Sequence, residues 1–89
     1  MTEVKRDSVT EKLKQAQEKV RTGEKYAHYR SPEKPYVVLS VALLEATEEP
    51  CVVYQALVGD QLIWVRPLHS FLEQVESSGK MVARFQKIC

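Results

Sequence analysis

Trp64 and Arg66 are the residues whose types and spacing point most directly to ligand chemistry. They lie in "DQLIWVRPLHSF", where the only tryptophan of the chain stands two residues before an arginine. An indole offers a flat surface on which a planar ring stacks, and a guanidinium holds a phosphate or carboxylate through paired hydrogen bonds. The pair predicts a site for a planar anionic ligand. The competing interpretation is that the N-terminal helix covers Trp64, since a lone tryptophan usually contributes much buried area.

A second group of aromatic and basic residues lies in "KYAHYR", which contains Tyr26, His28 and Tyr29. In an extended strand Tyr26 and His28 share one face, and Tyr29 lies on the other. Such residues either contact a nucleic acid or seal one end of a small barrel. Together with residues of later strands they complete the candidate ligand-binding set: Tyr26, His28, Tyr29, Gln55, Trp64, Arg66 and Arg84.

Catalytic and metal-binding signatures are not recognisable in this sequence. His28 and His69 are far apart, and Cys51 and Cys89 lack the short paired spacing of a zinc site. The three glycines are too widely separated for a phosphate-binding loop. We therefore expect no metal, no cofactor and two reduced cysteines. A small-molecule enzyme remains an alternative, with His28 and Asp60 as its candidate acid or base groups.

Length and composition predict one small globular domain. The chain has 89 residues, of which 44% are hydrophobic and 28% charged. Thirteen basic residues face twelve acidic ones, so the net charge of +1 excludes a broad basic surface for nucleic acid. The longest apolar run, residues 36–44, is far shorter than the roughly 20 residues that span a bilayer. With no apolar signal-peptide segment at its start, the sequence predicts a cytoplasmic protein that does not contact membranes.

An amphipathic helix is predicted within residues 1–22. Ser8 and Glu11 have the spacing of a capping box, and Gly23 is a plausible stop. Its apolar stripe repeats at intervals of four, three and four residues and consists of Val9, Leu13, Ala16 and Val20. Two heptads are few for a coiled coil, so the stripe is expected to dock on the chain's own sheet. A homodimer through the same stripe is the alternative.

Residues 23–89 are predicted to form a small β-rich domain. Runs of β-type residues indicate about five strands, at residues 25–30, 36–44, 51–58, 62–66 and 84–88. We expect an α+β fold, in which the helix packs on a small bent antiparallel sheet or on a partly closed SH3-like barrel.

The connection at Gly59-Asp60 predicts a two-residue hairpin loop. That loop would place Gln55 opposite Trp64 and Tyr54 opposite Val65. Strand alternation then predicts an apolar core face comprising Tyr54, Ala56, Val58, Ile63 and Val65. Gln55, Trp64 and Arg66 would lie on the opposite face, which either receives the helix or binds a ligand.

Several blocks of the sequence resemble a known family. "GEKYAHYR", "YVVLSVA", "CVVYQALVGDQLIWVRPLHSF" and "ARFQKI" are similar to conserved blocks of the small bacterial proteins called domain of unknown function 1653. The resemblance spans Gly23 to Ile88 and implies a compact β-rich domain of uncharacterised function. Leu44 and Ala46 stand where members typically have histidine and glutamate, so no chemistry of that pair is carried over to this chain.

These observations favour a small cytoplasmic binding module for nucleic acid or a nucleotide-like ligand, through an aromatic and arginine surface. A protein-interaction or homodimerisation module that uses the helix is the first alternative. A small-molecule enzyme of unknown reaction is the second. The sheet face that the helix covers distinguishes between them, because it decides whether Trp64 is accessible.

Overall fold

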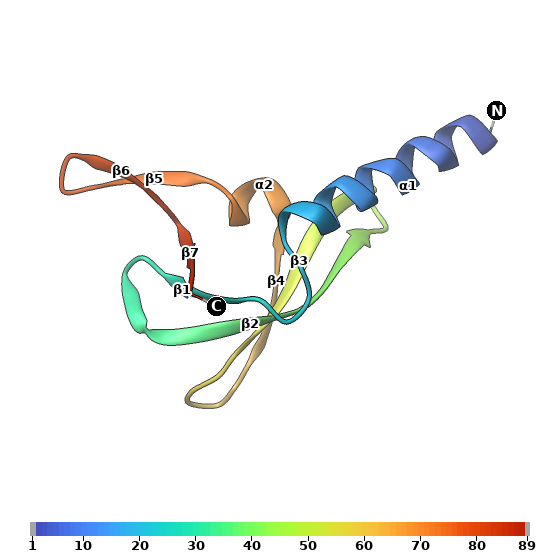
Figure 1. The fold of residues 1–89 in the computed structure, drawn as a ribbon. Coiled ribbons are helices and arrows are strands. Elements are labelled where there is room, and N and C mark those ends of the chain that lie inside the picture. The colour runs from blue at the N-terminus through green and yellow to red at the C-terminus, as the bar shows by residue number, and fades with distance from the viewer. Residues whose placement is uncertain (1, 89) are drawn as a thin grey trace.

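The computed structural model describes residues 2–88, with side chains for residues 8–88, and shows an α+β fold (Figure 1). The elements in chain order are α1 (Thr2–Lys19), β1 (Lys25–His28), β2 (Ser31–Leu44), β3 (Glu49–Ala56), β4 (Ile63–Pro67), α2 (Leu68–Phe71), β5 (Gln74–Ser77), β6 (Lys80–Ala83) and β7 (Phe85–Lys87). The predicted fold class is confirmed. No helix in this part of the chain is long and apolar enough to cross a membrane.

The main sheet has five antiparallel strands in the order β4-β3-β2-β1-β7. Its edge strands β4 and β7 do not pair with each other, so the open bent sheet is confirmed and a closed barrel is not formed. Register shifts lie between Val38 and Ser40 and between Ala27 and His28. Bulges of this kind bend a strand and increase its twist, which helps the long β2 to curve.

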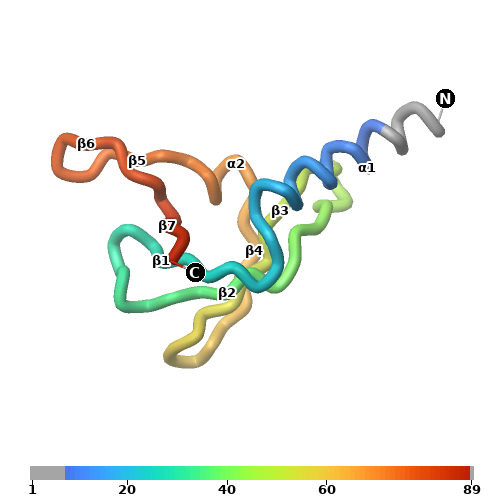
Figure 2. Tube along the Cα trace, viewed as in Figure 1, coloured from blue at the N-terminus to red at the C-terminus, as the bar shows by residue number. Residues whose placement is uncertain are grey.

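A second sheet, formed by β5 and β6, was not predicted. It consists of two strands of four residues each, which are joined by a turn at Ser78 and Gly79. Ser78 and Gly79 both have positive φ, at 54° and 80°. This hairpin extends away from the main sheet, in the direction opposite to α1 (Figure 2). Its strands have only four residues each, and strands this short carry little periodic signal.

Helix α1 begins at Thr2, so Ser8 lies inside the helix and the predicted capping box is wrong. The residues before Ser8 include glutamate, lysine and arginine, which favour helix and allow it to extend past a capping signal. After the helix, Gly23 has a φ of 91°, a conformation that glycine adopts without strain. The predicted stop at this glycine is consistent with the turn seen there.

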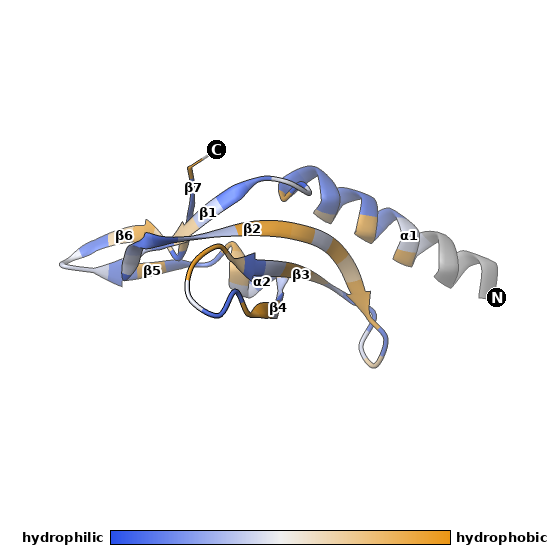
Figure 3. Ribbon diagram, turned by 90° about the horizontal axis from the view of Figure 1, so that it is seen from below, coloured by the Kyte–Doolittle hydropathy of each residue, from blue (hydrophilic) through white to orange (hydrophobic). Residues whose placement is uncertain are grey.

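The apolar stripe of α1 docks on the chain's own sheet, as expected. Ala16 and Val20 are 1% and 0% exposed in the core cluster, and Leu13 packs against it. Their neighbours on β2 and β3 are Val38, Val41 and Val52. Figure 3 shows hydrophobic residues along β2 and as bands on α1. The helix therefore covers one end of the sheet face that carries Val38, Val52 and Tyr54, which we call the inner face.

Aromatic rings fill the middle of the inner face. Phe71 of α2 stacks on Phe85 of β7, with ring centroids 4.3 Å apart and planes at 5°. Tyr26 and Tyr54 meet Phe71 edge to face, at 5.1 and 5.4 Å. Such geometry is favourable for aromatic pairs. This cluster joins α2 and β7 to the central strands.

The predicted register between β3 and β4 is wrong by one residue. Tyr54 faces Trp64 and Val52 faces Arg66. Gln61 adopts a φ of 54° after Gly59-Asp60, so the connection contains one more left-handed residue than the predicted two-residue loop. A shift of one residue moves every side chain of a strand to the other face. Ile63 and Val65, which were expected in the core, are therefore 57% and 62% exposed on the outer face.

Candidate functional site

An open pocket of about 200 Å³ lies on the inner face, beyond the end that α1 covers. All five strands of the main sheet contribute to its lining, which consists of His28, Tyr36, Tyr54, Trp64, Arg66 and Phe85. We call it the aromatic–arginine pocket. Its lining contains four hydrophobic or phenolic rings, one imidazole and one guanidinium, and no carboxylate.

Cross-strand pairing explains why these residues meet. Trp64 lies directly opposite Tyr54 in the β3–β4 ladder, and Phe85 lies opposite His28 in the β1–β7 ladder. Residues that face each other across antiparallel strands project from the same face. Tyr36 on β2 completes the ring, with its aromatic centroid 5.3 Å from that of Tyr54. The pocket is thus a product of the strand order and the observed register.

Arg66 is held by neutral groups. Its Nε donates to the Tyr54 hydroxyl at 3.4 Å, and an Nη donates to Oγ of Ser70 at 2.9 Å. The guanidinium carbon lies 5.4 Å from the centre of the Phe85 ring, in cation–π contact. No carboxylate among residues 8–88 forms an ion pair with it. Its positive charge therefore remains available to an anionic ligand.

His28 packs edge to face on Phe85, with ring centroids 5.2 Å apart. Its Nδ1 accepts a hydrogen bond from the backbone N–H of Arg30 at 3.2 Å, so the neutral tautomer carries its proton on Nε2. Burial lowers the pKa of His28, and the nearby charges of Arg66, Arg84 and Arg30 lower it further. At neutral pH the imidazole is therefore an uncharged hydrogen-bond donor in a positive environment.

Trp64 is 49% exposed, although it shares the inner face with α1. The helix packs on β2 and β3 through Ala16 and Val20. The interpretation in which the helix covers Trp64 is therefore wrong. Half of the indole is accessible at the rim of the pocket.

Two further predicted residues lie close to the pocket without lining it. The ring of Tyr29 is 4.9 Å from that of His28, and its hydroxyl accepts a hydrogen bond from Nε of Arg30 at 2.9 Å. Arg84 forms an ion pair with Glu73 at 2.8 Å. Its Nε is buried and has no hydrogen-bond partner among the described residues.

Tyr26 and Gln55 lie elsewhere. Tyr26 is buried in the core, where its hydroxyl donates to Glu24 at 2.9 Å. Burial and the Glu24 carboxylate raise the pKa of Tyr26 to about 12. Gln55 faces Ile63 on the outer side of the hairpin and donates to the carbonyl of Gln61 at 3.1 Å. The structure thus brings His28, Trp64 and Arg66 together and leaves these two residues outside the pocket.

Sequence reasoning did not include Tyr36, Tyr54 and Phe85 in the site. Tyr54 had been assigned to the core face, and the observed register brings Trp64 and Arg66 to that same face. Phe85 reaches the pocket through the pairing of β7 with β1, which are distant in sequence. No local pattern indicates such a pairing, but the correct hairpin register would have linked Tyr54 to Trp64.

The other groups considered for chemistry lie outside the pocket. Asp60 is exposed in the β3–β4 loop. Cys51 is a buried free thiol whose pKa is raised by burial, and Cys89 lies outside the described residues. Within the described part of the chain, no three His, Cys, Asp or Glu residues are grouped so as to hold a metal ion.

Comparison with known proteins places this fold in a family. A crystal structure of a DUF1653 protein from Bordetella bronchiseptica is similar, with a TM-score of 0.67 and 27% sequence identity over 80% of this chain and 90% of that chain. No curated protein matches the sequence. Residues 24–87 match the family described as "Protein of unknown function (DUF1653)". This chain therefore belongs to the DUF1653 family, as the blocks of its sequence predicted.

Proposed function

We propose that this protein is a small binding module that takes a planar anionic ligand of the nucleotide class in the aromatic–arginine pocket. The observation that carries the proposal is the pairing of Arg66, which has no acidic partner among the described residues, with the half-exposed Trp64. The indole supplies a stacking surface, and the guanidinium supplies a fork of hydrogen-bond donors for an anion.

The charge of the pocket decides between anionic and cationic ligands. A group of aromatic rings by itself is also suited to a cation. Here Arg66 lines the pocket, and no aspartate or glutamate does. The nearby arginines also disfavour a positive charge on His28. Two like charges 4 Å apart repel by roughly 4 kcal/mol at a protein surface, so the pocket favours an anion.

The expected affinity is modest. Stacking of one base on an aromatic side chain contributes about 1–3 kcal/mol. A hydrogen bond to a charged group contributes about 1.5–3 kcal/mol. Together these terms give about 2.5–6 kcal/mol, which corresponds to a dissociation constant between roughly 40 μM and 15 mM. Titrations must therefore extend to millimolar ligand.

The alternative functions have less support in the geometry. A homodimer through Val9, Leu13, Ala16 and Val20 would use a stripe of which Ala16 and Val20 are already buried in the chain's own core. An enzyme would use His28 or Asp60 as its acid or base; Asp60 does not line the pocket, and His28 lies there without a second candidate acid or base beside it. The binding module uses the residues that the structure does bring together.

The proposal is tested by titrating the protein with nucleoside monophosphates and short oligonucleotides while following the fluorescence of Trp64, the only tryptophan. We expect ligand-dependent quenching in the wild type. Loss of a charged hydrogen bond in Arg66→Ala should weaken binding about 10-fold or more.

Arg21→Ala is the matched control, because it removes the same charge from an exposed residue that does not line the pocket. It should leave the affinity within about twofold. The proposal fails if millimolar ligand does not change the wild-type fluorescence, or if the two variants bind equally well.

A further inference from the structure

We infer that the aromatic–arginine pocket recognises one nucleoside monophosphate group, either free or at the end of a strand, and does not follow an internal stretch of nucleic acid. The inference rests on the proposed function and narrows its ligand to a base with a terminal phosphate. It is carried by the size of the pocket, by the number of cations that face it and by the positions of the other charges.

The pocket has room for little more than one ring system. Its volume of about 200 Å³ is below the range of roughly 300–1,000 Å³ that is usual for drug-sized ligands. Trp64 is the half-exposed aromatic residue at its rim. Sites that hold several successive bases present several such rings along a groove. A single base on Trp64 therefore fits the pocket, and a run of bases does not.

Arg66 is the only lysine or arginine that lines the pocket. Arg84 is paired with Glu73, whose carboxylate also repels a neighbouring phosphate. Arg30 packs over the ring of Tyr29, with its guanidinium carbon 5.6 Å from the ring centre. One cation with free hydrogen-bonding capacity thus faces the ligand, which is enough for one phosphate.

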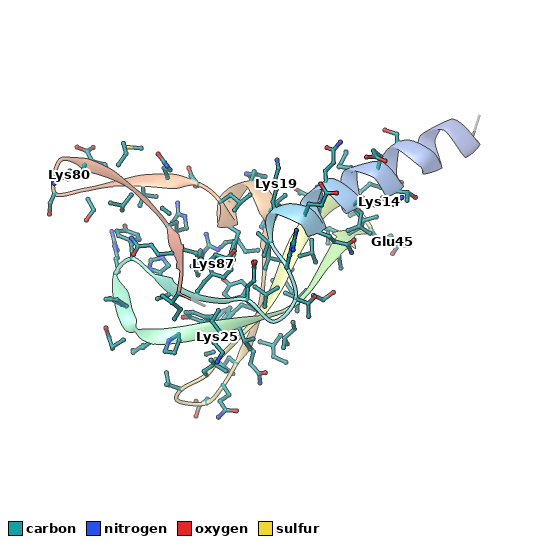
Figure 4. The ribbon with its side chains drawn as sticks, in the orientation of Figure 1. Lys14, Lys19, Lys25, Glu45, Lys80 and Lys87 are labelled. Carbon is teal, nitrogen blue, oxygen red and sulfur yellow. The ribbon has the colours of Figure 1, made fainter. Side chains whose placement is uncertain are left out.

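The lysines labelled in Figure 4 do not form a track that leads away from this cation. Those labelled in Figure 4 are spread over α1, β1, the tip of the β5–β6 hairpin and β7: Lys14, Lys19, Lys25, Lys80 and Lys87. Lys87 is also paired with Glu24 at 3.0 Å. Proteins that bind single strands without sequence preference use a continuous positive groove along the backbone. These five lysines, spread over different elements, offer no such groove.

A terminal phosphate suits a single guanidinium better than an internal one. A phosphate monoester carries about −1.5 to −2 charges at pH 7, whereas an internal diester carries one. The planar guanidinium can bind two oxygens of the same phosphate. The neutral His28 can donate its Nε2 proton within the same pocket. The ligand therefore gains most when its charge is concentrated on one terminal group.

The test compares four probes by Trp64 fluorescence: adenosine, adenosine monophosphate, a deoxyadenosine ten-mer with no terminal phosphate, and the same ten-mer with a 5′-phosphate. We expect the monophosphate to bind about 10-fold or more tighter than adenosine. The phosphorylated ten-mer should match the monophosphate and exceed the unphosphorylated one. The logarithm of affinity should fall with the logarithm of salt concentration with a slope near one, since about one phosphate is neutralised.

Arg66→Ala should abolish the preference for the phosphate over adenosine, and Arg66→Lys, which keeps the charge, should retain part of it. Arg21→Ala should not change the preference. The inference is overturned if the unphosphorylated ten-mer binds more than about 10-fold tighter than the monophosphate with a salt slope of several, or if adenosine binds as well as its monophosphate. Binding by none of the four probes would instead contradict the proposed function itself.

Discussion

His28 is the residue whose protonation reports the charge inside the pocket. Its imidazole packs against Phe85, and its surroundings include the guanidinium groups of Arg66, Arg84 and Arg30. Burial and these charges act in the same direction on its pKa. A phosphate on Arg66 would offset part of the positive field. The pKa of His28 should therefore rise when a phosphate ligand binds.

The imidazole resonances of the free protein should show that His28 titrates below the ordinary value of 6.5. Recording them by NMR from pH 8 to pH 4.5, with His28→Gln to assign the signal, measures this directly. Millimolar adenosine monophosphate should move the midpoint upward. A midpoint at or above 6.5 in the free protein would show that the three arginines and burial do not act on the ring as the geometry implies.

The lowered pKa of His28 also makes the free energy of unfolding depend on pH. Because the unfolded chain takes up the proton at a higher pH than the folded one, the contribution of His28 is complete above about pH 6.5 and is lost as the pH falls through the folded pKa. Urea unfolding at pH 7.5 and pH 5.5 should therefore show a smaller acid-induced loss in His28→Gln than in the wild type. Equal losses would contradict this assignment.

At the level of elements, the turn between β3 and β4 decides which residues reach the pocket. Gln61 has a φ of 54°, in the left-handed region that costs a residue with a side chain roughly 1–2 kcal/mol. This residue accounts for the shift that puts Trp64 and Arg66 on the inner face with Tyr54. The pocket thus depends on one strained position, Gln61, which lies three residues before Trp64, the residue that faces Tyr54.

Gln61→Gly should leave the free energy of unfolding unchanged or raise it by up to about 1 kcal/mol, because glycine adopts positive φ without strain but has more freedom when unfolded. Gln74→Gly is the matched control, since Gln74 is an exposed residue in the extended β5. It should lower stability by about 0.5–1 kcal/mol. Urea unfolding measures both. An equal loss in the two variants would show that Gln61 is extended and that the register is the one first predicted.

The parts of the fold that could be predicted are those with a local signal. The periodic stripe with Ala16 and Val20 predicted a helix that docks on the sheet, and β-type runs predicted the five strands of the main sheet. The β3–β4 register could not be derived, because Gly59-Asp60 fits a two-residue loop equally well on composition. The left-handed conformation of Gln61 costs free energy, and this cost is offset only by contacts that Trp64 and Arg66 make on the inner face of the sheet.

The candidate site was predictable to the same extent. Trp64 and Arg66 stood out by residue type, and His28 by its aromatic neighbours. Phe85 enters the site through the long-range pairing of β7 with β1, which no short pattern encodes. Gln55 was included through the incorrect register and lies on the outer face.

At the scale of the whole molecule, the pocket and the fold share one core. Phe71, which is buried on α2, contacts Tyr26 of β1, Tyr54 of β3 and Phe85 of β7. Tyr54 and Phe85 also line the pocket. Two of the rings that line the pocket, Tyr54 and Phe85, therefore also hold α2 on the sheet, so the pocket cannot persist when the core opens.

Phe71→Ala should destabilise the whole chain by about 3–5 kcal/mol, the usual cost of removing a buried phenylalanine ring. A domain of this length has a total stability of roughly 4–13 kcal/mol, so the variant should be marginal or unfolded. Leu72→Ala, at the exposed neighbouring position, should cost less than about 1 kcal/mol. Urea unfolding followed by far-UV circular dichroism and by Trp64 fluorescence should give coincident transitions in the wild type, because one core supports both signals. A Phe71→Ala variant that loses the fluorescence transition but keeps most of the circular dichroism transition would show that the pocket region unfolds apart from the rest.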